Sequence, residues 1–348
     1  MYATYAEESC SGIIIFKANF ERLKRASVPG KLILSLVLAM LLFGCRTSPQ
    51  ANTTPSDRLV LATLKGPSSM GMIRIIDSLS QGNGHHVEAK ILNEPMQVRK
   101  MMIEQSADFV ILPTTMAALL YNKGLEYQVV AIPVWGSLYL FAGDSTITHW
   151  EDLRGRRINL MARGMTPDVL FRYLLLQNNI DPDKDVRLDY SFPTHIDLAN
   201  AVAAGRCEVA VISEPLASMV EEKNSSVHRL FSLSEEWTKH QGNAVVETSF
   251  MVRKSTIQAC PEAVEQLLLS YEASTKWVNA NPDSAARLLV KYDISPNYLV
   301  GLSSIQHAKL KFVRAKGIDT EIEEYLEVFM QMNPDIIGGK IPDENFIY

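Results

Sequence analysis

The sequence predicts an α/β protein with two lobes, each a mainly parallel sheet flanked by helices, followed by a helical C-terminal tail. Strand patterns alternate with helical patterns from residue 59 to residue 246, which is typical of parallel strands joined by crossover helices. Two apolar segments, residues 138–142 and 244–252, are placed to carry the chain out of the first lobe and back into it. After residue 252 the pattern predicts helices only.

The length and composition agree with this architecture. With 348 residues, of which 47% are hydrophobic, the chain can form two domains with a full core. We expect lobe 1 to comprise residues 58–141 and 247–348, and lobe 2 to comprise residues 142–246. The net charge of -5 excludes a general nucleic-acid-binding or anionic-membrane surface, because both require an excess of Lys and Arg.

The first 45 residues are expected to be a leader that ends in a lipoprotein signal peptide. A basic flank precedes an apolar run, residues 32–43, that is shorter than the roughly 20 residues needed to span a bilayer. The segment Leu42-Phe43-Gly44-Cys45 resembles a bacterial lipobox, which implies cleavage before Cys45 and lipidation of its thiol. An ordinary signal peptide cut nearby, or an uncleaved anchor, remains the alternative. Residues 46–57 are expected to form a disordered tether.

The segment 152–176 carries the clearest functional pattern, because a strand, a loop and a helix start follow one another within it. Residues 157–161 predict a buried strand, and Thr166 is expected to be the N-cap of the following helix. Free backbone N–H groups and the helix dipole at such a start favour a polar or anionic ligand. The candidate ligand-binding residues here are Arg163, Gly164, Met165 and Thr166. Since every βα unit has such a turn, the pattern alone does not establish a site.

Two further strands are followed in the same way by a polar loop and a helix start. The loop after residues 59–64 holds a lysine, a glycine and two serines, either of which could cap the helix, and the loop after residues 108–112 holds two threonines. The candidate ligand-binding residues are Lys65, Gly66, Ser68, Ser69, Thr114 and Thr115. A cation beside such a loop would select an anionic group, and the alternative is a solvated surface side chain.

Four more residues are candidates because they flank predicted strands. Ser213 and Glu214 follow the buried strand at residues 209–212, and Glu214 could instead be only a favourable carboxylate at a helix start. Trp135 could stack on an aromatic ligand, although a core position is the stronger alternative, and Ser137 lies beside it between two strands.

Catalytic and metal-binding patterns are missing from the sequence. We find no G-x-S-x-G nucleophile motif and no phosphate-binding P-loop, and His85 and His86 are too close in sequence to share one helical face. We therefore expect no enzymatic activity, no cofactor and no metal site. Cys207 and Cys260 show no metal-ligand spacing, and we expect them not to be bonded to each other because they fall in different predicted lobes.

The order of several short motifs resembles that of a known family. These motifs are Asp152-Leu153-Arg154-Gly155, Gly164-Met165-Thr166-Pro167-Asp168, residues 181–186, residues 203–211 and Glu214-Pro215. In this order they resemble the second lobe of the solute-binding proteins of ABC importers, in the nitrate, sulfonate and taurine group that also includes pyrimidine-precursor binders. The resemblance extends from about residue 59 to residue 251, and it implies the type II periplasmic-binding-protein-like fold.

The resemblance implies an extracytoplasmic protein that is lipid-anchored to the bacterial cell membrane through Cys45. Such a protein captures a small solute, here anionic or heteroaromatic, and delivers it to an ABC permease and its ATPase subunit. A monomer that binds no nucleic acid is expected. Two alternatives remain open: an enzyme of the dehydratase or precursor-synthesis type on the same fold, and a ligand sensor for a membrane kinase.

Overall fold

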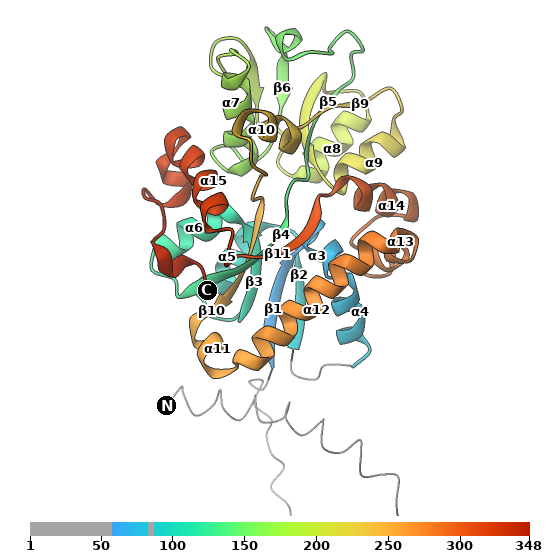
Figure 1. The fold of residues 1–348 in the computed structure, drawn as a ribbon. Coiled ribbons are helices and arrows are strands. Elements are labelled where there is room, and N and C mark those ends of the chain that lie inside the picture. The colour runs from blue at the N-terminus through green and yellow to red at the C-terminus, as the bar shows by residue number, and fades with distance from the viewer. Residues whose placement is uncertain (1–57, 83–86) are drawn as a thin grey trace, which may run out of the picture. The chain divides into compact units, whose positions relative to one another are not determined.

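The computed structural model describes residues 58–82 and 87–348, and Figure 1 shows their fold. Leu59–Tyr348 form one compact unit. The predicted leader, the tether and the lipidation site Cys45 lie outside the described residues. Within the described ranges, no helix combines the length and the apolar character needed to cross a membrane.

The first of two sheets contains six strands in the order β11-β4-β10-β3-β1-β2. Strands β1, β2 and β3 are parallel, whereas β10 is antiparallel to β3 and β4, and β11 is antiparallel to β4. The bounds are β1 (Leu59–Leu64), β2 (Val87–Leu92), β3 (Phe109–Pro113), β4 (Tyr127–Val134), β10 (Thr248–Arg253) and β11 (Leu310–Arg314).

The second sheet contains five strands in the order β7-β6-β8-β5-β9. Strand β6 is parallel to β7 and β8, and β5 is antiparallel to β8 and β9. The bounds are β5 (Leu138–Ala142), β6 (Arg157–Asn159), β7 (Arg187–Asp189), β8 (Val209–Ser213) and β9 (His228–Ser232). Two sheets flanked by helices confirm the predicted fold class.

Helices connect and cover the strands of both sheets (Figure 1). Those within or beside the sheets are α3 (Pro67–Gly71), α4 (Ile73–Ser80), α5 (Pro95–Ile103), α6 (Thr114–Asn122), α7 (Thr166–Gln177), α8 (His195–Ala203), α9 (Leu216–Lys223) and α10 (Leu233–Gln241). Those after β10 are α11 (Lys254–Ala259), α12 (Pro261–Ala280), α13 (Pro282–Lys291), α14 (Tyr298–His307) and α15 (Asp319–Met332). Short 3-10 turns lie at Trp150–Leu153, Pro334–Ile337 and Glu344–Phe346.

Strand β3 shows why a continuous apolar run marks a central strand. Its side chains alternate between two cores: Phe109 and Ile111 pack with the helices α4 and α12 on one face, and Val110 and Leu112 belong to the core on the other. Because successive residues of a strand point to opposite faces, a strand that is covered on both faces must be apolar at every position.

Two chain segments connect the sheets. Residues 135–137 join β4 to β5, and residues 242–247 join α10 to β10. In the first, Gly136 has a φ of 145°, and a Cβ atom there would lie 2.3 Å from the side chain of Ser234, so only glycine fits. All of β5 belongs to the five-stranded sheet, so the sheets separate at residues 135–137. The sequence places this boundary too late, between residues 141 and 142.

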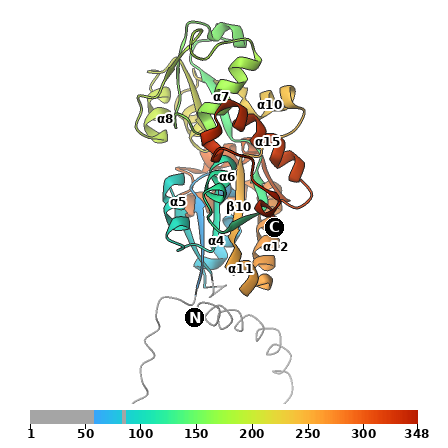
Figure 2. The same ribbon diagram turned by 90° about the vertical axis from the view of Figure 1, so that its left-hand side faces the viewer.

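The C-terminal tail differs from the prediction in two ways. It contains β11, a short strand at the edge of the six-stranded sheet, although helices only were expected. It also contacts helices of both sheets, whereas packing on lobe 1 alone was expected: α12 lies against α3 and α4, α13 lies against α4, α14 lies against α9, and α15 lies against α7. Figure 2 shows α15 beside α7 and α10, where the rings of Trp237 and Tyr325 are 5.3 Å apart.

The two cysteines of the described chain occupy buried positions in different parts of the fold. Cys207 is a free thiol just before β8, and Cys260 lies just before α12. Since Cys207 is free, the two are not bonded to each other, as expected.

Candidate functional site

Residues from both sheets line a cavity of about 500 Å³, which we call the cleft cavity. Its walls come from segments that follow β1, β2 and β8, from the start of α8, from α9 and from the loop before α14. The lining residues are Lys65, Asn93, Glu94, Thr194, His195, Ile196, Ser213, Glu214, Pro215, Leu216, Met219, Asp293, Ile294 and Pro296. Ligands of α/β proteins commonly bind outside the carboxyl ends of parallel strands, which is where this cavity lies.

Lys65 lines the cleft cavity directly after β1, and an acidic side chain neutralises it. Its Nζ atom is 2.7 Å from Oδ2 of Asp293, which lines the same cavity from the loop after α13. The side chain of Lys65 is 35% exposed and that of Asp293 is 91% exposed, so water screens the pair. The predicted cation is therefore at the cavity, but its charge is already matched.

Glu214 lines the cavity after β8, and its carboxylate belongs to a buried charge network. Its Oε1 atom accepts a hydrogen bond of 2.6 Å from Arg229, and its Oε2 atom accepts one of 3.2 Å from the backbone N–H of Ser218. Arg229 also donates to Glu221 at 2.8 Å and lies over the ring of Tyr139. Burial alone would lower the pKa of Arg229, but the two carboxylates raise it above its usual value.

His195 and Glu94 both line the cavity, His195 as the first residue of α8 and Glu94 just before α5. Burial lowers the pKa of His195, and the charge of Glu94 opposes this shift only in part. His195 is therefore neutral at neutral pH. Within residues 58–82 and 87–348, no group of three or more His, Cys, Asp or Glu side chains is arranged to hold a metal ion.

A direct hydrogen bond joins the first turns of two helices, α6 and α7, which follow strands of the six-stranded and the five-stranded sheet respectively. The hydroxyl groups of Thr115, in the first turn of α6, and Thr166, the first residue of α7, are 2.7 Å apart, and both side chains are buried. Beside them, Ser249 of β10 donates to the hydroxyl of Thr114 at 3.0 Å. Thr166 was expected to cap α7, but Met165 occupies the N-cap position and Thr166 uses its hydroxyl between the sheets.

The glycine loop before α7 is closed by a side chain of the same helix. The backbone N–H of Gly164 donates to Oδ2 of Asp168 at 2.7 Å, and Oδ1 of Asp168 accepts hydrogen bonds from Tyr190 at 2.5 Å and Arg172 at 2.9 Å. Arg163 is exposed and lies over the ring of Tyr190. A carboxylate of the protein thus occupies the position at the loop where the sequence suggested an anionic ligand. Met165 is half-buried against the core.

The loop after β1 also uses its hydroxyl internally. Ser69 accepts a hydrogen bond from the N–H of Gly66 at 3.1 Å and donates to its carbonyl at 2.9 Å, so Gly66, and neither serine, is the N-cap of α3. The carbonyl oxygen of Ser68 accepts a bond from Tyr271. A Cβ atom on Gly66 would lie 3.6 Å from the carbonyl oxygen of Glu214, so this loop approaches the end of β8 closely.

Trp135 and Ser137 have partners away from the cleft cavity. The indole N–H of Trp135 donates to the carbonyl of Lys311 in β11 at 2.7 Å. Ser137 donates to the carboxylate of Glu247 through its backbone N–H at 2.7 Å and its hydroxyl at 2.5 Å, which ties the two crossing segments together. Burial raises the pKa of Glu247, and the hydrogen bonds from Ser137 oppose the shift.

The structure brings three of the predicted residues to the cleft cavity, and these are Lys65, Ser213 and Glu214. Thr115 and Thr166 meet each other, and Gly66 approaches Glu214. Sequence reasoning missed Asn93 and Glu94, which follow β2, and the start of α8, which follows β7. The pattern could have identified them as strand ends, but not shown which strand ends meet.

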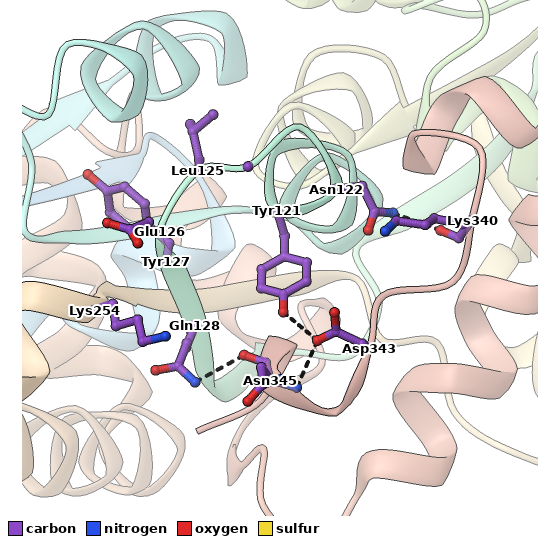
Figure 3. Close-up of a pocket in the computed structure, with 11 residues that line it drawn as sticks. Tyr121, Asn122, Leu125, Glu126, Tyr127, Gln128, Lys254, Lys340, Asp343 and Asn345 are labelled. Carbon is purple, nitrogen blue, oxygen red and sulfur yellow. Dashed lines mark hydrogen bonds between the residues drawn. The ribbon is translucent and has the colours of Figure 1, made fainter.

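A second cavity, of about 330 Å³, lies between α6, β4 and the C-terminal residues, and we call it the tail cavity. In Figure 3 the hydroxyl of Tyr121 points toward Asp343, to which it donates at 2.5 Å, and the amide of Gln128 reaches the carbonyl of Asn345. Lys254 and Lys340 also line this cavity. None of the residues predicted from the sequence lines this cavity.

Solved structures share this fold. A crystal structure of an ABC transporter protein from Parabacteroides distasonis superimposes with a TM-score of 0.72 and 25% identity, covering 84% of this chain and 98% of that one. The periplasmic aliphatic sulphonate binding protein SsuA from Escherichia coli gives a TM-score of 0.67 at 15% identity, covering 83% of this chain and 90% of SsuA, and at that identity it shows the fold alone.

Sequence comparisons point to the same class. The binding protein YtlA of Bacillus subtilis (strain 168) is 28% identical over 129 residues, which is 37% of this chain, so the match spans only 36% of that curated relative. The family model described as "ABC transporter, phosphonate, periplasmic substrate-binding protein" matches residues 70–295, more than half of the chain. The resemblance to ABC solute-binding proteins is confirmed, and the chain belongs to this family of periplasmic substrate-binding proteins.

Proposed function

We propose that the protein is an extracytoplasmic solute-binding lipoprotein of an ABC importer. It holds a small solute between two lobes, built on the six-stranded and the five-stranded sheets, and delivers the solute to the permease and its ATPase subunit. It acts as a monomer and carries out no chemistry itself. The observation that supports this most is the hydrogen bond between Thr115 and Thr166, because it joins buried helix starts from the two sheets.

The contacts between the sheets explain how binding would be coupled to closure. A ligand shifts a protein between open and closed states only if it binds one of them better. In the structure the loop after β1 approaches the end of β8, and the walls of the cleft cavity come from both sheets. A solute that touches both walls therefore favours the closed state.

A bulky side chain at Thr166 tests this proposal. Thr166→Tyr should prevent the approach of α6 and α7, so that a solute which raises the melting temperature of the wild type has no effect on the variant. Thr320→Tyr, on an exposed position of α15, is the matched control and should retain the response. The screen would use sulfonates, phosphonates, nitrate and aminopyrimidines. An unchanged response in Thr166→Tyr would show that the binding site lies elsewhere.

The membrane anchor is a separate part of the proposal and rests on the segment Leu42-Phe43-Gly44-Cys45. Mass spectrometry of protein extracted from membranes should find Cys45 at the mature N-terminus with acyl chains attached. The Cys45→Ser variant should remain unprocessed or be released from the membrane fraction. An unmodified N-terminus at another residue would refute lipidation and would leave the solute-binding proposal intact.

A further inference from the structure

We infer that the cleft cavity binds a small organic cation, such as a protonated amine or nitrogen heterocycle with a short apolar body. This inference rests on the proposed function and names the chemical class of its solute. The sequence favoured an anionic solute because Lys65 and Arg163 lie next to predicted cleft loops, and the family resemblance added heteroaromatic solutes. The positions and partners of the charged groups around the cavity indicate instead a solute with a positive charge.

The cavity wall contains one cation and three carboxylates. Lys65 is the only lysine or arginine among the lining residues, all of which belong to the described part of the chain, and the carboxylates are Glu94, Glu214 and Asp293. The charge of Lys65 is matched by Asp293 at 2.7 Å. Arg163 lies outside the cavity, over the ring of Tyr190. An anionic solute would therefore find no unmatched positive charge in the wall.

Glu214 and Glu94 differ in their surroundings. The carboxylate of Glu214 is bound by Arg229 from behind the wall, so that pair contributes little net charge. Within residues 58–82 and 87–348, no basic side chain forms a salt bridge with Glu94. His195, which also lines the cavity, is neutral at neutral pH because burial lowers the pKa of that imidazole. Glu94, an exposed residue at the N-cap of α5, thus adds a negative charge that no basic side chain pairs with.

Apolar side chains form another part of the cavity wall, and they suit a solute with an apolar body. Leu216 and Met219 project from α9, Ile294 comes from the loop after α13, and Ile196 from the start of α8. A volume of about 500 Å³ lies within the usual range for small-molecule sites, which combine apolar walls with a few polar groups. The combination of an apolar wall with one unmatched carboxylate fits an amphipathic cation better than a phosphonate or sulfonate.

The sign of the cavity's charge can be measured without knowing the natural solute. In Ser213→Cys the introduced thiol lines the cavity, and its reaction rates with a cationic and an anionic methanethiosulfonate reagent of similar size are compared. Ser225→Cys, on an exposed turn after α9, is the matched control, and the wild type provides the blank. Clefts of one charge sign concentrate the opposite ion, so the cation-to-anion rate ratio should exceed that of the control by about tenfold or more.

Glu94→Gln, added to Ser213→Cys, should bring this ratio close to that of the control, because Gln keeps the shape of the side chain and removes its charge. A ratio at or below that of the control in Ser213→Cys would overturn the inference. A ratio that is unaffected by Glu94→Gln would overturn the role of Glu94.

Matched solutes separate this inference from the proposed function. Propylamine, propanesulfonate and propylphosphonate share one apolar body and differ in charge. A melting-temperature rise with either anion that is abolished by Thr166→Tyr would overturn the inference and support the proposed function. Retention of every solute response in Thr166→Tyr would count against the proposed function. The rate ratio measured in Ser213→Cys does not depend on that result and would still test the charge of the cavity.

Discussion

Glu214 and Glu247 lie on two sides of Ser137, and the protein stabilises their carboxylates in different ways. The backbone N–H of Glu214 donates to the carbonyl of Ser137 at 3.0 Å, and its buried side chain pairs with Arg229. The carboxylate of Glu247 accepts two hydrogen bonds from Ser137, and no basic residue in the described ranges pairs with it. Although Glu247 is only half-buried as a residue, burial of its carboxylate raises its pKa.

This comparison separates two functions of buried acids in one fold. Glu214 helps to form a wall of the cleft cavity, and Arg229 keeps that wall in place through Glu214, Glu221 and Ser218. Glu247 lies on the second crossing segment, where only neutral donors hold it. We therefore expect the wall to depend on charge pairing and the crossing to depend on the protonation of one group.

The largest expected effect on stability comes from breaking the ion pair between Arg229 and Glu214. Arg229→Met would leave the carboxylate of Glu214 buried without its partner, which typically costs about 3–5 kcal/mol of unfolding free energy. Urea unfolding at pH 7 measures the loss. Glu214→Gln combined with Arg229→Met should recover much of it, because an uncharged amide is cheaper to bury. A loss below about 1 kcal/mol in the single variant would show that water reaches Glu214.

A second test concerns Glu247, the acid that has no basic partner. The folded-state pKa of Glu247 is raised above its ordinary value of 4.5, so the folded protein binds more protons than the unfolded chain between those two values. Stability is therefore full below the ordinary value and declines as the pH rises through the folded-state pKa, by roughly 1.4 kcal/mol for each unit of difference.

Glu247→Gln should remove this decline, because the amide oxygen can still accept from Ser137 and carries no charge. Urea unfolding of both proteins between pH 4.5 and pH 8 gives the comparison. The wild type should lose stability relative to the variant as the pH rises. Parallel curves for the two proteins would mean that Glu247 titrates normally and that the crossing is not sensitive to pH.

Local patterns in the sequence predict much of the framework. The apolar segment at residues 138–142 is strand β5 with the same bounds, and among the helices expected after residue 252, two begin at Pro261 and Pro282. These elements are predictable because a strand that is covered on both faces must be apolar throughout, and because Pro suits the first turn of a helix.

The site was less predictable, because its contacts join residues that are distant in sequence. Lys65 and Asp293 are 228 residues apart, and Thr115 and Thr166 are 51 residues apart. The local pattern correctly marked Thr166 as the start of a helix, but it assigned the hydroxyl to a cap and not to a contact between sheets. Strand β11 was missed because five residues at a sheet edge carry too little periodicity.

The hydrogen bond between Thr115 and Thr166 is a third kind of contact, because it joins residues from the two sheets and involves no charged group. Thr115→Val and Thr166→Val keep the branched shape and remove the hydroxyl groups. A double-mutant cycle in urea should give a coupling of about 0.5–1.5 kcal/mol, the usual net value of a hydrogen bond. Additive effects would mean that the two hydroxyls do not bind each other in solution and that the lobes are open without solute.

The smallest effect is expected at the ion pair between Lys65 and Asp293, which also joins a basic side chain to a carboxylate but faces water. Exposed pairs contribute about 0.2–1 kcal/mol and weaken with salt, so Lys65→Met should cost no more than that, and less at about 1 M NaCl. Asp293→Asn is the matched control, since Asn tolerates the positive φ of 54° at this position. A loss above about 2 kcal/mol would mean that the cleft cavity excludes water around Lys65, and charge pairing would then be equally strong on both of its walls.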